Sequence, residues 1–164
     1  MSKMSRVVRL AFSSAVLASM ACAAGAVRAD DEVIEGKLRA CVSDGTAIGG
    51  VNACGKRWKL KSGEIDLDRD GDLEVEIKGL VLDDPSTGDA NGTADGVTHV
   101  VASLVCGGSG GKVVAESDRY PLSKSGSAEF ETKLKLPAEC KAPVILIREV
   151  WEGKVGGWLA VTGF

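Results

Sequence analysis

Apolar and polar side chains alternate with a period of two in two stretches of the chain, residues 72–82 and 127–136. Successive side chains of a β-strand point to opposite faces, so this alternation predicts two strands with one buried and one solvated face each. The apolar members are Leu73, Val75 and Ile77 in the first stretch, and Ala128, Phe130, Thr132, Leu134 and Leu136 in the second.

Residues 97–106 (VTHVVASLVC) are apolar at both alternating sets of positions and rich in β-branched side chains. This composition predicts a central strand that is covered on both faces. Residues 143–151 and 157–164, which flank a turn-rich segment, predict a closing hairpin. Weaker strands are expected within residues 32–42, 54–60, 63–67 and 112–116.

About nine short strands separated by Gly-rich turns are typical of an all-β fold, and we predict an antiparallel β-sandwich. A closed barrel is the alternative. We find no window with a convincing helical period, and we expect residues 83–96 (DDPSTGDANGTADG) to form a long surface loop.

Residues 1–29 have the organisation of a cleavable signal peptide. Lys3, Arg6 and Arg9 precede an apolar stretch built largely from Ala and Ser, and no acidic residue occurs before Asp30. Cleavage is expected after Ala29, which leaves residues 30–164 as a single domain in the periplasm or the medium. An uncleaved membrane anchor and lipidation at Cys22 are the alternatives.

Removal of the leader makes the domain acidic. Four of the chain's 20 basic residues and none of its 23 acidic residues lie in the leader, so the mature chain has a net charge of −7. This charge argues against nucleic acid and anionic membrane surfaces as partners. We expect no membrane span after signal cleavage.

Four cysteines stay in the mature chain, Cys41, Cys54, Cys106 and Cys140, which predicts two disulfides. Three pairings are possible. We favour Cys41–Cys54 and Cys106–Cys140, because each pair then links neighbouring parts of the chain. The spacings of 13, 52 and 34 residues contain no CxxC, which argues against a zinc site or a redox pair.

Asp66, Asp68, Asp70 and Asp72 alternate in the manner of an EF-hand calcium loop, with Gly71 at its sixth position. However, Ile77 stands where a bidentate Glu is required, and no helices are expected on either side. We therefore favour a β-hairpin whose tip is residues 69–71, with a calcium site as the alternative. Calcium is the only cofactor that the sequence suggests.

We find no catalytic constellation, and we favour a protein that is not an enzyme. Residues 107–111 match the GxSxG pattern of hydrolases around Ser109, but a strand-like segment follows, and the only histidine, His99, precedes the motif. One histidine also cannot make a blue-copper site. The basic run at residues 56–61 around Trp58 is either a docking patch or, as we favour, the solvated face of a strand.

Five segments of the carboxy-terminal half, ASLVCGG, YPLSKSG, LPAEC, APVILIR and WLAVTGF, resemble a group of small exported bacterial proteins of unassigned function. The resemblance covers roughly residues 79–164, and it implies bacterial export without implying any activity. The chain also ends on Phe164 after an alternating segment, as many outer-membrane β-barrels do, but it has few aromatic residues and many charged ones for a lipid-facing band.

We therefore predict an exported envelope or secreted β-sandwich that serves as a binding or structural module through its loops. Its partner would be a protein, a glycan or a small ligand. The alternatives are a calcium-stabilised module, a small outer-membrane barrel and a small hydrolase.

Overall fold

A computed structural model describes residues 32–42, 45–94 and 96–162. The predicted signal peptide, its cleavage site, Cys22 and the terminal Phe164 lie outside the described residues. No helix among the residues described is long and apolar enough to cross a membrane.

The described residues form eleven strands and two short 3-10 helices. The strands are β1 (Glu32–Ala40), β2 (Trp58–Lys59), β3 (Ser62–Asp68), β4 (Asp72–Lys78), β5 (Val81–Leu82), β6 (His99–Cys106), β7 (Lys112–Glu116), β8 (Tyr120–Pro121), β9 (Ala128–Lys133), β10 (Val144–Trp151) and β11 (Lys154–Thr162). The helices are η1 (Pro85–Ala90) and η2 (Gly108–Gly110).

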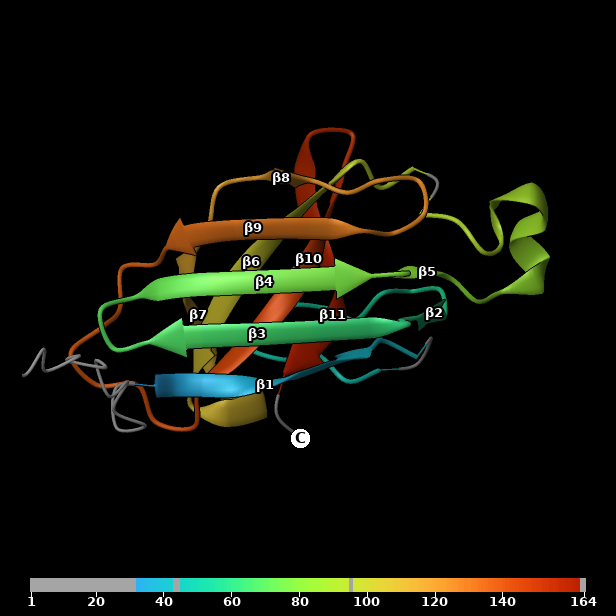
Figure 1. The fold of residues 1–164 in the computed structure, drawn as a ribbon. Coiled ribbons are helices and arrows are strands. Elements are labelled where there is room, and N and C mark those ends of the chain that lie inside the picture. Colours follow the sequence, from blue (N-terminus) through green and yellow to red (C-terminus); the bar gives the residue numbers. More distant parts are fainter. Residues whose placement is uncertain (1–31, 43–44, 95, 163–164) are drawn as a thin grey trace, which may run out of the picture.

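Nine strands belong to one antiparallel sheet with the order β7-β6-β10-β11-β1-β3-β4-β9, in which β8 also pairs with β6. Strands β2 and β5 form a separate pair. Strand β1 joins the two halves of the sheet, because Glu32–Lys37 pair with β3 whereas Leu38–Ala40 pair with β11. The sheet therefore curls into a half-barrel in which β9, β4, β3 and β1 lie in front of β6, β10 and β11 (Figure 1).

The structure confirms a mostly antiparallel β fold with two disulfides, but it does not confirm a sandwich. The two facing layers are parts of one curled sheet, since β1 changes its hydrogen-bonding partner along its length. Alternation along a strand reports which side chains are buried and carries no information about which strands are its neighbours. For this reason the curl could not be derived from the pattern.

The main core lies between the two layers, and it confirms the predicted alternation. In β4 the apolar side chains Leu73, Val75 and Ile77 are buried, while Asp72, Glu74 and Lys78 are exposed. In β9 Ala128 and Phe130 are buried between exposed neighbours. Burial of each of the larger side chains among these, Leu73, Val75, Ile77 and Phe130, stabilises the fold by about 1.5 to 3 kcal/mol.

The predicted central strand, β6, is buried on both faces. Its inward side chains, which include Val100, Ala102 and Leu104, join the main core. A second, smaller core covers the outer face of β6, β10 and β11, where Ile48 and Val51 from the segment 45–57 pack with Val105, Leu146 and Trp158. This segment explains why Val105, on the outer face of β6, is buried.

The other predicted strands and the closing hairpin are also present, but only Trp58 and Lys59 of the segment 54–60 form a strand, and β11 begins at Lys154, earlier than predicted. The β10–β11 turn places Glu152 and Gly153 at φ of +46° and +75°, the left-handed conformation that a two-residue hairpin turn favours. Sequence patterns did not indicate the two-residue strand β8 or the separation of β5 from β4. Loop 83–96 follows β5 and contains η1, which projects from the end of the half-barrel where β2 and β5 lie (Figure 1).

Candidate functional site

A pocket of about 290 Å³ opens at this end of the half-barrel. Its apolar lining includes Trp58, Leu82 and Val97, which are buried members of the main core, so the pocket is the place where that core reaches solvent. Helix η1 contributes Thr87 and Ala90 to the rim. The volume lies near the lower limit of sites that bind small molecules.

Glu149 places a carboxylate in this apolar pocket. Ile145, Ile147 and Glu149 stand at alternate positions of β10, and both isoleucines are fully buried in the main core. Because alternate residues of a strand share a face, Glu149 continues an inward-facing apolar row. A charged side chain at such a position has a desolvation cost that packing alone does not explain.

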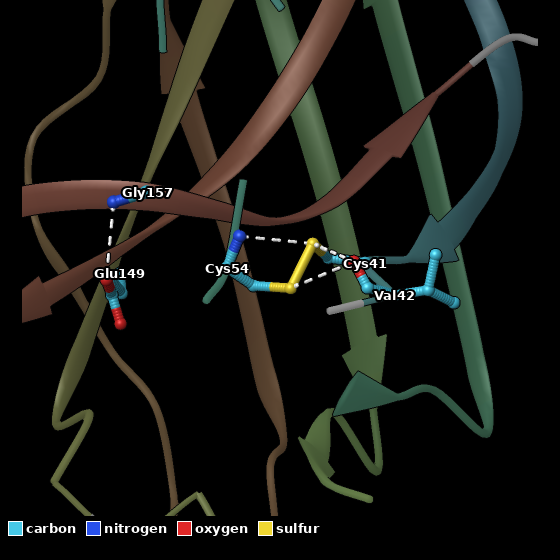
Figure 2. The surroundings of a disulfide bond; sticks show 5 residues. All are labelled: Cys41, Val42, Cys54, Glu149 and Gly157. Atoms are coloured by element: carbon cyan, nitrogen blue, oxygen red, sulfur yellow. Dashed lines mark hydrogen bonds between the residues drawn. A yellow bond between two sulfur atoms is a disulfide. The ribbon is translucent and has the colours of Figure 1, made fainter. Parts of the chain in front are cut away.

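The Glu149 carboxylate accepts a hydrogen bond from the Gly157 amide, with 3.3 Å between N and Oε1 (Figure 2). Partial burial raises the pKa of Glu149, and this hydrogen bond partly opposes the increase. No cation pairs with Glu149 among the described residues. The carboxylate therefore has lone pairs that a ligand can use.

Two adjacent glycines of β11 make room for the Glu149 carboxylate and for the segment beside it. A Cβ atom on Gly156 would lie 2.7 Å from Glu149 Oε1, and one on Gly157 would lie 2.8 Å from the carbonyl oxygen of Ala53. Side chains at these positions would displace the carboxylate or the segment 52–53. The absence of side chains at Gly156 and Gly157 therefore allows the Glu149 carboxylate and the segment 52–53 to take the positions that they have beside the pocket.

Trp151, at the end of β10, forms one side of the pocket, and 48% of its surface is exposed. Its indole lies against the backbone of Gly96, where a Cβ atom would come within 1.7 Å of Trp151 Cζ3. Gly96 also has a φ of +86°, which favours glycine. The glycine therefore allows loop 83–96 to hold an exposed indole in a defined place.

An ion pair between two loops closes the rim. Lys56 Nζ lies 3.6 Å from Asp84 Oδ2 and 3.4 Å from Ser86 Oγ, to which it donates a hydrogen bond. Asp84 caps η1 by accepting a hydrogen bond from the Ser86 amide. Hydrogen bonding from Ser86, with a smaller contribution from Lys56, lowers the pKa of Asp84. The charge of Lys56 is therefore balanced within the rim.

The Cys41–Cys54 disulfide supports the wall of the pocket (Figure 2). Cys54 lines the pocket and donates its amide hydrogen to Cys41 Sγ at 3.1 Å. The Trp58 amide donates to the Cys41 carbonyl oxygen at 3.0 Å. The bridge and these hydrogen bonds together position Trp58 relative to the end of β1.

Asp66, Asp68, Asp70 and Asp72 lie along the β3–β4 hairpin, and their carboxylates have separate roles. Asp68 Oδ1 accepts hydrogen bonds from the amides of Asp70 and Asp72, at 2.8 and 3.0 Å, and so stabilises the turn. Asp72 pairs with Lys133 of β9 at 2.9 Å. Among the described residues, no group of three or more acidic, His or Cys side chains is placed to hold a metal ion.

The residues of the hydrolase alternative do not come together. His99 begins β6 and hydrogen-bonds to Thr98 Oγ1, whereas Ser109 lies in η2 beyond the other end of that strand. An eight-residue strand is roughly 25 Å long. Ser109 and His99 therefore cannot form a nucleophile–base pair in this structure.

The four basic side chains of the run are exposed, while Trp58 is buried and Leu60 is partly buried, as the sequence indicates. Only Lys59 of the four belongs to β2. Asp83 lies 3.3 Å from Arg57 and 3.4 Å from Lys59, so these two cations share one carboxylate of the loop that follows β5. Together with the Lys56–Asp84 pair, this contact offsets two of the four positive charges of the run.

The outer face of β1, β3, β4 and β9 carries many carboxylates. The strand register places acidic residues directly opposite one another in two rows, Glu35–Asp66–Glu74–Glu131 and Glu64–Glu76–Glu129. Like charges at such close range destabilise a sheet. Lys37 extends the second row at one end. Lys78 forms an ion pair with Glu76 in the middle of this row, so its charge offsets part of the repulsion there.

Comparison with models of protein families, with curated proteins and with solved structures finds no match. The resemblance of residues 79–164 to small exported bacterial proteins therefore stays a prediction. The candidate site depends on the geometry described above. No pattern in the sequence indicates this pocket, because Trp58, Glu149 and Trp151 become neighbours only through the fold. The one feature of the sequence that could have indicated the pocket is Glu149, a carboxylate in the otherwise apolar inward row of residues 143–151.

Proposed function

We propose that this chain is an exported, disulfide-linked β protein that binds a small, partly apolar ligand in the pocket between Trp58 and Trp151. One observation carries the proposal: Glu149 continues the inward-facing row of Ile145 and Ile147 where the main core opens to solvent. An apolar concave site with a few polar groups directed into it is the usual form of a small-molecule site.

The construction of the pocket supports this proposal, because several independent contacts hold its walls. The Cys41–Cys54 bridge holds one wall, the Lys56–Asp84 ion pair spans the rim, and Gly96 provides the surface on which Trp151 rests. A site that is organised before the ligand arrives loses less conformational entropy on binding.

Export is supported by the amino-terminal charge pattern and by the cysteines. All four cysteines of the predicted mature chain form disulfides, which persist in oxidising compartments and are rare in the cytosol. We propose the periplasm or the medium as the location. A binding protein exposed to these environments benefits from covalent crosslinks, because they limit the freedom of the unfolded chain.

A pocket-filling substitution tests the function. Ala90 lines the pocket, whereas its neighbour Asp89 is exposed and does not line it. We expect indole and 2-phenylethanol, as neutral probes, to bind the unmodified protein and an Asp89→Leu variant in saturation-transfer NMR. An Ala90→Leu variant should lose this binding. Failure of both probes to bind the unmodified protein, or equal binding by Ala90→Leu, would contradict the proposal.

A further inference from the structure

The pocket has two charged lining residues, Lys56 and Glu149, in different electrostatic situations. Lys56 at the rim is paired with Asp84 and hydrogen-bonded to Ser86. Glu149 lies deeper, at the end of an apolar row, and a single backbone amide is its hydrogen-bond partner in the described part of the chain. The pocket therefore presents a negative charge without a counter-ion.

An aromatic surface lies beside this carboxylate. Trp151 is two residues after Glu149 on β10 and lies on the same face of the strand, and both side chains line the pocket. The Trp151 indole is about half exposed and is held in place by the backbone of Gly96. The face of an indole attracts cations more strongly than that of any other aromatic side chain.

We propose that the pocket selects an organic cation, namely an ammonium group carried by a small apolar body. This inference rests on the proposed function of the same pocket. The ammonium group would donate hydrogen bonds to Glu149 and contact the Trp151 indole, while the apolar body would pack against Trp58, Leu82 and Val97. An anionic ligand of the same shape would be repelled by Glu149, and a neutral one would leave the carboxylate without a counter-ion.

Three ligands with one phenyl body and different charges test this selectivity on the unmodified protein. They are 2-phenylethylamine, 2-phenylethanol and 3-phenylpropanoate, with affinities measured by isothermal titration calorimetry at neutral pH. We expect the amine to bind at least tenfold more tightly than the alcohol, as a charge-assisted hydrogen bond implies. The propanoate should bind more weakly than the alcohol.

Two variants then assign the selectivity to Glu149. Glu149→Gln should bring the affinity for the amine to within about threefold of that for the alcohol, with little effect on the alcohol itself. Glu131→Gln removes the same charge from the exposed outer face of β9, so it should keep the full preference for the amine. Trp151→Leu should weaken binding of the amine more than binding of the alcohol.

The possible outcomes separate this inference from the proposed function. Equal or tighter binding of the alcohol or the propanoate would overturn the preference for cations and leave a pocket that binds neutral or anionic ligands. If none of the three phenyl ligands binds, the preference for cations is overturned. The proposed function fails as well only if the neutral probes give the same result with the unmodified protein, Ala90→Leu and Asp89→Leu. The ligand comparison uses the unmodified protein, so it does not depend on whether Glu149→Gln folds.

Discussion

At the scale of single residues, the aspartates of the β3–β4 hairpin have different roles that their regular spacing conceals. Asp68 accepts two backbone hydrogen bonds across the turn, whereas the Asp70 side chain accepts none among the described residues. Asp68 therefore has the role of a turn cap. The alternation that suggests a calcium loop is the ordinary alternation of the outward face of a strand, continued into the turn.

The first prediction concerns this cap. We expect Asp68→Ala to lower the free energy of unfolding by about 1 kcal/mol, because two amides lose their acceptor. Asp70→Ala is the matched control and should change it by less than about 0.5 kcal/mol. Urea unfolding of the unmodified protein and both variants measures these changes, and its repetition with millimolar calcium tests the calcium site. A rise in stability with calcium that Asp68→Ala abolishes would instead favour the calcium site.

The second prediction concerns Glu149 and pH. Burial raises the pKa of Glu149 in the folded protein above its unfolded value, so the native state binds protons more readily and the carboxylate destabilises the fold above that raised pKa. Glu149→Gln should therefore be more stable than the unmodified protein at neutral pH. The gain should be under about 1 kcal/mol, because the side chain is partly solvated and solvent screens its charge.

Thermal unfolding of both proteins across the acidic range measures this effect. The difference should disappear as the pH falls below the ordinary Glu value of about 4.3, where the carboxyl is protonated in both the folded and the unfolded states. A difference that is constant with pH would show that Glu149 acts through packing instead of through its charge.

At the scale of elements, the register between strands decides which charges meet. Glu74 in the middle of β4 lies opposite Asp66 of β3 on one side and Glu131 of β9 on the other. Each of these strands alternates well by itself, so no local pattern reveals that three carboxylates stand in one row. The acidic face is a consequence of pairing.

The third prediction follows from that row. We expect Glu74→Lys to raise the free energy of unfolding by about 0.5 to 1 kcal/mol at low salt, because two repulsive pairs become attractive. The gain should shrink toward 1 M salt as screening shortens the range of the interaction. Glu139→Lys makes the same change of charge in an exposed loop and should have a smaller effect. Equal gains in the two variants would attribute the effect to net charge alone.

The fourth prediction concerns the segment 45–57, which covers the outer face of β10 and β11. Replacing both Cys41 and Cys54 with Ala should destabilise the protein by about 3 kcal/mol through the freedom gained by the unfolded chain. Hydrogen exchange should increase most at the Trp158 amide, which donates to the Asn52 carbonyl oxygen. The matched double variant at Cys106 and Cys140 should leave the Trp158 amide protected. Equally fast exchange of this amide in both double variants would contradict a local role of the Cys41–Cys54 disulfide.

At the scale of the whole molecule, the fifth prediction concerns export. Protein recovered from the periplasm or the medium should begin at Asp30 and hold Cys41, Cys54, Cys106 and Cys140 as disulfides. The intact mass shows where the recovered protein begins. Alkylation with and without prior reduction shows whether its cysteines are oxidised. A mass that includes residues 1–29 would contradict cleavage, and alkylation without prior reduction would contradict the disulfides.

The sequence by itself determined most of the strands and the faces that they bury. It left three cysteine pairings open and favoured the one that the structure contains. These features are local. The alternation in residues 72–82 and 127–136 reports burial directly, and Cys41 and Cys54 are close enough along the chain for neighbouring segments to bring them together.

Only the tertiary structure decided how these elements are arranged. The curl depends on β1, which exchanges β3 for β11 between Lys37 and Leu38, and pairing of this kind depends on backbone hydrogen bonds that any sequence can make. The pocket likewise combines Trp58, Glu149 and Trp151 from distant parts of the chain. A site assembled by long-range pairing leaves no periodic signal, because the spacing along the chain does not constrain its members.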